Sequence, residues 1–430
     1  MVDAAPFRGV RYDPQVAGDA ETTSAPAYDD IERFAYARHR TASPYTVLEL
    51  LAARGARGYA DAGGTLDRWW RTRVLVADPE PAFYRYEEHE LRDGVPAVQR
   101  GLMVALRLEP LDGRGAVLAH EEVDPTRVEE RLERLEAAPL DVSPVFAMYR
   151  DGPTELRDLL DRPPLSRPLV AASDETGTDH RIWRVGDAGD IALVRAALST
   201  LRVVIADGHH RYATALAHAH RLGDAADSTA HRTLAYLVDA QVHGPRLEPV
   251  HRLLRSAPAD LLDRLAADFT IEPAPADPRT LELRLRASRR CVFGLRLAEG
   301  RGYLLRPRDE DALRGRLPGD RSPAWRAVDA VILAAAVLGP LGVDPSAVEP
   351  RTDAAGAAAA VDGGQASALI LVRPTTAAVV HEVAERGEPL PAKTTSFHPK
   401  PRTGLLMRAV GDPTYVRPVR DEPGAGRGSA

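Results

Sequence analysis

The chain has 430 residues, of which 44% are hydrophobic and 27% are charged, and its formal net charge is −6. This composition predicts a folded protein of two or three domains, excludes a disordered chain and disfavours a nucleic-acid partner, which would call for a basic surface. No apolar run reaches the roughly 20 residues of a membrane helix, no secretory signal is recognisable, and a single cysteine forms no internal disulfide, so we expect a cytoplasmic protein.

The first half of the chain predicts a mixture of strands and helices. Residues 1–30, which prolines interrupt, predict irregular structure, whereas 82–110 alternate as two strands around a charged turn. An Asp-Pro pair is typical of a helix start and predicts a helix over 124–138. The charged residues around this helix predict a solvated face: Arg127, Glu130, Arg131 and Arg134. Residues 151–180, rich in Asp, Pro, Gly and Thr, predict a loop or linker.

The second half continues the alternation. Apolar periodicity predicts helices over 191–201 and near 327–338, and short apolar runs predict strands at 203–206 and 369–372. Together these elements indicate an α/β fold with mixed α+β sheets. We expect four parts, in chain order: an N-terminal region (1–165), a central region (166–275), a C-terminal region (276–420) and a disordered tail (421–430).

The most informative segment follows the predicted strand at 203–206. Gly208 permits a sharp turn, and apolar residues then recur at helical spacing from Tyr212 onward. The first N–H groups of that helix are unpaired and lie at the positive end of its dipole, which suits a phosphate. Arg211 adds a planar set of donors for phosphate oxygens. This segment predicts a phosphate-binding corner.

Three further polar residues of the corner have more than one interpretation. His209 and His210 can donate hydrogen bonds or move protons near neutral pH, or they can form a plain polar patch. Asp207 can bind a metal ion, here Mg²⁺, or only cap the turn. Zinc is disfavoured, because neighbouring histidines do not easily share one ion and no HExxH or CxxC pattern is present.

Other candidates lie outside the corner. Glu121 is a candidate general base at the end of a predicted strand, although an exposed strand-end pair with His120 is an equal alternative. The remaining candidates are contacts to substrate or phosphate: His120, His251, Arg252, Lys393 and Lys400.

The residues from Ala206 to Leu216 resemble the signature of the prokaryotic family catalogued as domain of unknown function 1015. Further blocks similar to this family cover nearly the whole chain: Pro6–Arg8, Trp69–Tyr84, His120–Glu121, Ser143–Phe146, Pro249–Leu254, and Pro374 to Leu405. The corner itself, with a strand leading to Gly208 and then to Arg211, is similar to the phosphate-binding box of the ParB/sulfiredoxin-like superfamily, which includes partition proteins, sulfiredoxins and free serine kinases.

This resemblance implies a nucleotide-binding core and a nucleotide-dependent phosphotransferase that acts on a small hydroxyl-bearing metabolite, serine-like by analogy. ATP or ADP would be the co-substrate, with phosphates on Gly208, His209 and Arg211, Mg²⁺ bridging them, and His210, Glu121 or Asp207 as catalytic groups. We expect replacement of Arg211 by alanine to weaken nucleotide binding much more than folding.

The sequence departs from the family pattern at several positions. Basic residues of the pattern are replaced by Glu49 and Thr126, an asparagine by Asp141, and two C-terminal aromatic residues by Ser396 and His398. Loss of arginine and lysine weakens anion binding. Two alternatives to an active enzyme therefore stay open: a nucleotide-binding regulatory switch, and a degenerate paralogue that binds only a metabolite or a protein partner. The substrate and the oligomeric state are not predicted.

Overall fold

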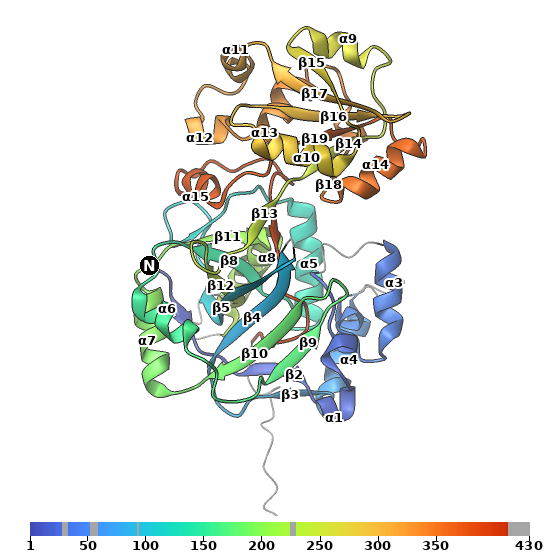
Figure 1. Ribbon diagram of the computed structural model, residues 1–430. Coiled ribbons are helices and arrows are strands. Elements are labelled where there is room, and N and C mark those ends of the chain that lie inside the picture. The colour runs from blue at the N-terminus through green and yellow to red at the C-terminus, as the bar shows by residue number, and fades with distance from the viewer. Residues whose placement is uncertain (28–32, 52–58, 93, 224–228, 412–430) are drawn as a thin grey trace, which may run out of the picture. The chain divides into compact units, whose positions relative to one another are not determined.

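The computed structural model describes residues 1–27, 33–51, 59–92, 94–223 and 229–411 (Figure 1). The chain forms two compact units. Unit 1 comprises Met1–Val117, Val123–Gly244 and the chain from Pro399 onward, and unit 2 comprises Leu118–Glu122 and Pro245–His398. The predicted disordered tail, 421–430, lies outside the described residues, and the predicted boundaries at 165 and 275 stay a prediction.

Unit 1 is built on a large mixed sheet. In spatial order its main strands are β6 (Val117–Leu118), β11 (Val203–Asp207), β8 (Val145–Tyr149), β12 (Arg232–Asp239), β5 (Val95–Arg107), β4 (Phe83–Arg92), β10 (Asp179–Val185) and β9 (Val170–Ser173), while β1 (Ala4–Ala5) pairs with β5. Strands β8 and β12 run parallel, and β11 runs antiparallel to β8. The predicted α/β fold with mixed sheets is confirmed.

Helices and a smaller sheet complete unit 1. The smaller sheet has the order β3 (Leu75–Ala77), β2 (Gly9–Tyr12), β21 (Met407–Ala409) and β7 (Leu140–Asp141). The helices are α1 (Pro14–Ala17), α2 (Ala20–Thr23), α3 (Arg33–Ala42), α4 (Ala60–Arg71), α5 (Pro125–Ala137), α6 (Thr154–Asp161), α7 (Ala188–Leu198) and α8 (His209–Leu222), with 3₁₀ turns η2 (Val47–Leu50) and η4 (Thr229–His231).

Unit 2 has a six-stranded antiparallel sheet with an apolar core of its own. Its strand order is β15 (Phe269–Ala274), β17 (Arg301–Pro307), β16 (Phe293–Leu297), β19 (Ala368–Leu371), β14 (His251–Leu254) and β18 (Val348–Arg351), and β13 (Arg246–Glu248) pairs separately with β20 (Ser396–His398). The helices are α9 (Leu261–Ala266), α10 (Pro278–Ala287), α11 (Glu310–Gly315), α12 (Pro323–Arg326), α13 (Asp329–Val331), α14 (Ala354–Asp362) and α15 (Ala377–Glu385), with a π-helical turn η5 (Ile332–Leu338) after α13 and a 3₁₀ turn η6 (Pro345–Ala347).

Most predicted elements are confirmed, but the predictions for two stretches of the chain are wrong. The hairpin over 82–110 and the helix over 124–138 are present, with Asp124 as the N-cap and Pro125 in the first turn. The predicted loop at 151–180 instead contains α6, β9 and the start of β10, because Leu156 and other leucines of α6 pack into the core of unit 1. Residues 1–30 likewise include strands and short helices. None of the described helices combines the length and apolar character needed to cross a bilayer.

Candidate functional site

A sharp turn joins β11 to α8, as the sequence predicts. Strand β11 is buried up to Ala206, and α8 begins at His209. Between them Gly208 has a φ of +95°, a left-handed conformation that other residues rarely adopt. A Cβ at Gly208 would also lie only 3.0 Å from Cζ of Arg211. Glycine is therefore required here both by the backbone and by the arginine that covers it.

Two cations meet one carboxylate at this turn. The guanidinium of Arg211 donates through Nη2 to Oδ2 of Asp207, and Lys400 Nζ lies 3.2 Å from Oδ1 of the same carboxylate. The other side of the guanidinium donates to Ser143 Oγ at 2.7 Å and to the Pro144 carbonyl oxygen. Burial opposes ionisation of Asp207, but Lys400 and Arg211 outweigh it and hold its pKa far below the usual range. Asp207 thus fixes both cations beside the start of α8.

Helices α5 and α8 pack in parallel, with their N-termini side by side. At that end the backbone N–H of Asp124, the N-cap of α5, donates to Nε2 of His210 at 3.0 Å. Near the other end Arg221 of α8 pairs with Glu136 of α5 at 3.0 Å. The positive ends of two helix dipoles therefore lie together. Nε2 of His210 is the acceptor of this hydrogen bond.

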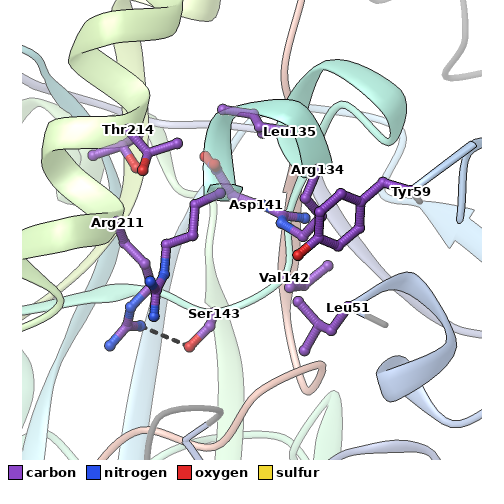
Figure 2. Close-up of a pocket in the computed structure, with 11 residues that line it drawn as sticks. Leu51, Tyr59, Arg134, Leu135, Asp141, Val142, Ser143, Arg211 and Thr214 are labelled. Atoms are coloured by element: carbon purple, nitrogen blue, oxygen red, sulfur yellow. Dashed lines mark hydrogen bonds between the residues drawn. The ribbon is translucent and has the colours of Figure 1, made fainter. Parts of the chain in front are cut away.

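A cavity of about 70 Å³ lies on the flank of α8 (Figure 2). Two arginines of α5, Arg131 and Arg134, line it together with Arg211 and Thr214 of α8 and with Ser143. The prediction of a solvated face on α5 is wrong for Arg131 and Arg134, which are half-buried. The i,i+3 spacing of these arginines was a visible signal, but nothing in the sequence showed that α5 packs against α8.

Two of the departures from the family pattern, Asp141 and Glu49, lie in unit 1. Asp141, another residue of the cavity wall, accepts a hydrogen bond from the Leu234 backbone N–H at 2.9 Å and pairs with Arg408 at 2.8 Å. Glu49, in η2, pairs with Arg40 at 3.1 Å. Each acidic side chain thus has a basic partner within unit 1.

The candidates of unit 2 gather around the segment 390–395. Glu121 accepts the backbone N–H of Lys393 at 3.3 Å, and the buried guanidinium of Arg252 donates to the Lys393 carbonyl oxygen at 3.1 Å. The φ of Lys393 is +58°, an uncommon conformation for a residue with a side chain. His120 Nε2 lies 2.8 Å from Thr395 Oγ1. Burial lowers the pKa of Arg252 to about 10.

His251 makes two hydrogen bonds within unit 2. Its Nδ1 accepts the backbone N–H of Val372 at 3.2 Å, and Nε2 donates to Glu282 at 2.9 Å. The side chain is fully buried, so these bonds anchor β14 in its sheet. In β20, Ser396 Oγ lies 2.9 Å from Nε2 of His398, so two further departures from the family pattern contact each other.

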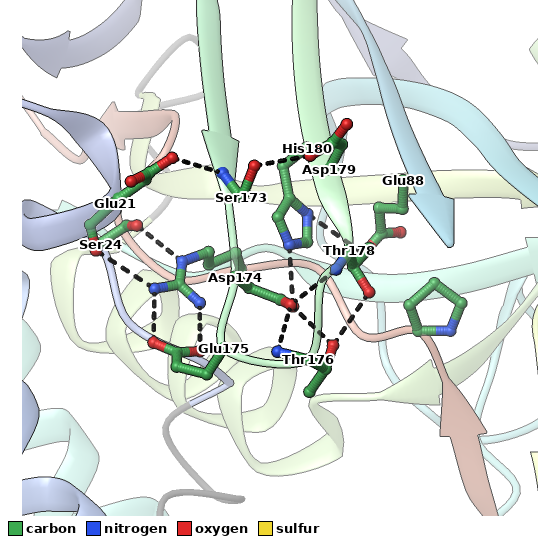
Figure 3. Close-up of polar contacts among 12 residues, drawn as sticks. Glu21, Ser24, Glu88, Ser173, Asp174, Glu175, Thr176, Thr178, Asp179 and His180 are labelled. Atoms are coloured by element: carbon green, nitrogen blue, oxygen red, sulfur yellow. Dashed lines mark hydrogen bonds and ion pairs between the residues drawn. The ribbon is translucent and has the colours of Figure 1, made fainter. Parts of the chain in front are cut away.

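A partly buried polar network lies in another part of unit 1, and Figure 3 shows the part of it around Asp174 and His180. The Tyr86 hydroxyl lies 2.7 Å from His180 Nδ1, and His180 Nε2 lies 3.2 Å from Asp174 Oδ2. Glu88, which has no exposed surface, accepts hydrogen bonds from Tyr86 and Gln99, and its burial raises its pKa to about 8. No sequence motif pointed to this network.

The predicted site residues fall into two groups. Unit 1 holds Asp207, Gly208, His209, His210, Arg211 and Lys400, and unit 2 holds His120, Glu121, His251, Arg252 and Lys393. Within the described part of the chain, no three His, Cys, Asp or Glu side chains are grouped so that they could hold a metal ion.

Fold and site together define a mixed α/β protein with a cationic strand–glycine–helix corner. The chain belongs to the family described as protein of unknown function (DUF1015), whose model matches residues 4–331. The resemblance to this family, drawn from the sequence motifs, is thereby confirmed. No curated protein matches the chain.

Several solved structures are similar to the chain at low identity. A free serine kinase in complex with AMP is 14% identical, with a TM-score of 0.33 over 69% of this chain and 88% of that chain. A conserved hypothetical protein from Pyrococcus furiosus is 14% identical, with a TM-score of 0.33 over 67% of this chain and 92% of that chain. C-terminally truncated SbnI from Staphylococcus aureus is 13% identical, with a TM-score of 0.35 over 71% and 86%.

Proposed function

We propose that the protein binds a nucleoside di- or triphosphate at the corner and transfers a phosphoryl group to a small hydroxyl-bearing metabolite. The observation that carries this proposal is the pair of cations, Arg211 and Lys400, held on the two oxygens of Asp207 beside the start of α8. Two positive charges face one negative charge there, and the N-termini of two helices add to the same potential.

The corner offers both kinds of phosphate donor. The first backbone N–H groups of α8 lie at the positive end of its helix dipole, which suits phosphate oxygens. Arg211 is already fixed by Ser143 and Asp207, so little side-chain entropy is lost when an anion binds. In phosphoryl transfer, such positioning and charge neutralisation supply most of the catalysis.

The role of Asp207 in this proposal differs from a base or a magnesium ligand. Its depressed pKa makes it a poor proton acceptor, since a general base works best with a pKa near the working pH. Each of its oxygens is bonded to a cation, so Asp207 does not fit a Mg²⁺ ion in this arrangement. We therefore derive no step through magnesium and assign Asp207 the positioning of Arg211 and Lys400.

The transfer requires a proton acceptor for the hydroxyl. The hydroxyl oxygen forms a bond to the terminal phosphorus, the bond from that phosphorus to its bridging oxygen breaks, and the hydroxyl proton passes to a base. His210 and Glu121 stay the proposed bases, and Arg252 and Lys393 stay proposed substrate contacts. For His210, accepting a proton at Nε2 means giving up the hydrogen bond from Asp124.

A second candidate is nucleotide binding without turnover, as in a regulatory switch. Thr126, in the first turn of α5, favours it, because a lysine is expected there by resemblance and would have added a charge beside the two helix N-termini.

Calorimetric titration with ADP and with ATP tests the proposal. We expect wild type to bind at least one of them and Lys400→Gln to bind it roughly tenfold or more weakly, the effect of losing a charged hydrogen bond. Arg195→Gln, at an exposed position of α7, is the matched control and should bind like wild type. Absence of binding by wild type would refute the proposal, and binding without phosphoryl transfer to any hydroxyl compound would leave the second candidate.

A further inference from the structure

We infer that helix α10 and the residues that follow it bind an anionic lipid surface through a cluster of exposed arginines. The cluster, called the arginine patch below, consists of Arg279, Arg284, Arg286, Arg289 and Arg290. Between residues 278 and 290 the only acidic residue is Glu282, although the chain as a whole has a net charge of −6. This inference concerns a surface of unit 2 and does not depend on nucleotide binding.

The packing of α10 leaves its arginines on the outside of unit 2. Leu281 and Leu285 are fully buried in an apolar core that α10 shares with α14, and the two helices lie side by side (Figure 1). The outward face of α10 presents Leu283, which is 60% exposed, together with the exposed arginines. The exposed positions in the middle of α14 have small residues or no side chain, so the arginines extend further than their neighbours: Ala355, Gly356 and Ala359.

The protein itself does not neutralise the arginine patch. Arg290 Nε lies 3.6 Å from a carboxylate oxygen of Glu310, which also pairs with Arg314 at 2.5 Å. Glu282 accepts a hydrogen bond from His251 at 2.9 Å and pairs with no arginine of the patch. The other members of the patch form no ion pair with any residue that the structure describes: Arg279, Arg284, Arg286 and Arg289. The patch therefore carries an excess of positive charge.

The electrostatics of the helix explain only part of the patch. Arg284 and Arg286 lie in the last turn of α10, where the helix dipole favours cations. Arg279 lies in the first turn, where the dipole opposes a cation, and Arg289 lies beyond the end of the helix. Like charges gathered in one place repel one another and raise the free energy of the folded protein. An anionic surface placed against the patch removes this repulsion, so the patch indicates a partner of opposite charge.

The exposed leucine among the arginines favours a lipid surface over other polyanions. Clusters of about four to eight basic residues on a helix bind anionic headgroups. Leu283 and the apolar stems of the arginines can enter the boundary between headgroups and acyl chains while the guanidinium groups stay among the phosphates. The phosphate backbone of a nucleic acid offers Leu283 no such apolar layer. Surface binding of this kind requires no membrane-spanning helix.

Co-sedimentation of the full chain with lipid vesicles tests the inference. We expect wild type to bind vesicles of phosphatidylcholine mixed with phosphatidylglycerol and not vesicles of phosphatidylcholine alone. Binding should weaken as sodium chloride is raised, because salt screens exposed charges. Each arginine near an anionic surface contributes roughly fivefold, so the triple variant Arg279→Gln, Arg284→Gln, Arg286→Gln should bind on the order of 100-fold more weakly. Leu283→Ser should also weaken binding, without changing its dependence on salt.

The matched control replaces three exposed arginines of unit 1 and changes the net charge equally: Arg71→Gln, Arg114→Gln and Arg195→Gln. It should bind the vesicles like wild type. Circular dichroism shows whether each variant folds, and if the triple variant of the patch does not, Arg284→Gln alone supplies the comparison with a loss of roughly fivefold. Absence of wild-type binding to the anionic vesicles, or equal losses in the patch and control variants, would overturn the inference. Binding of a labelled DNA duplex in place of the vesicles would overturn it in favour of a nucleic-acid surface.

Discussion

Lys400 Nζ lies 3.2 Å from Oδ1 of Asp207, although the two residues come from distant parts of the sequence. The opposite oxygen of the carboxylate accepts from Arg211. One carboxylate thus holds two cations beside the N-terminus of α8. Substitutions at the corner should therefore affect the stability of the fold as well as ligand binding.

Arg211→Ala should destabilise the fold, contrary to the expectation from sequence. The side chain is only 19% exposed and donates to Asp207, Ser143 and the Pro144 carbonyl. Its removal leaves partly buried acceptors without a donor, which costs about 1–3 kcal/mol of unfolding free energy. Urea unfolding measures the loss. The exposed Arg127→Ala should change stability by about 0.5 kcal/mol or less, and an equally small effect at Arg211 would contradict this account.

Asp207→Asn should lower stability at neutral pH and lose its effect in acid. The pKa of Asp207 is depressed in the folded state, so its contribution is present above the unfolded value of about 3.9 and disappears as pH falls through the folded pKa. The stability difference between wild type and Asp207→Asn should therefore begin to shrink as pH falls below about 4 and continue to shrink toward the much lower folded pKa. Asp67→Asn, at an exposed position of α4, is the control. A stability difference independent of pH would exclude an ionic role for Asp207.

Glu88→Gln should stabilise the protein at and above neutral pH. Burial raises the pKa of Glu88 to about 8, so the folded state favours the protonated form. The stability from this group is fully present below the unfolded pKa of about 4.3 and is lost as pH rises to about 8. The amide avoids that loss, so the melting temperature of the variant should exceed that of wild type increasingly from pH 5 to pH 8. A gain that does not grow with pH would refute the assignment.

Gly208→Ala should cost more than the same change at Gly387, just after α15. Both glycines have a positive φ, +95° and +66°, and alanine in the left-handed conformation costs about 1–2 kcal/mol. A Cβ at Gly208 also approaches Arg211 to 3.0 Å, whereas at Gly387 it meets nothing within 4 Å. Chemical denaturation of the two variants isolates the contribution of the arginine. Equal losses would mean that Arg211 moves aside without cost.

The local sequence was sufficient to predict the strand, the turn and the helix of the corner. The apolar run of β11, Gly208 and the helical periodicity of α8 each act within a few residues, and all three are present. The stretch 151–180 shows where this reasoning fails. Its polar composition favoured the prediction of a loop, but the segment contains the short helix α6. The leucines of α6 are buried only because the sheet of unit 1 lies beside them.

The sequence by itself determined the strand–glycine–helix corner and membership of the family, because turn geometry, periodicity and motif spacing are properties of neighbouring residues. Only the tertiary structure decided that Lys400 reaches Asp207 and that α5 lies parallel to α8. It also turned Arg131 and Arg134 from a predicted solvated face into the wall of a cavity. Such contacts join segments far apart in the chain, and they form because packing buries apolar faces together, which no local pattern specifies.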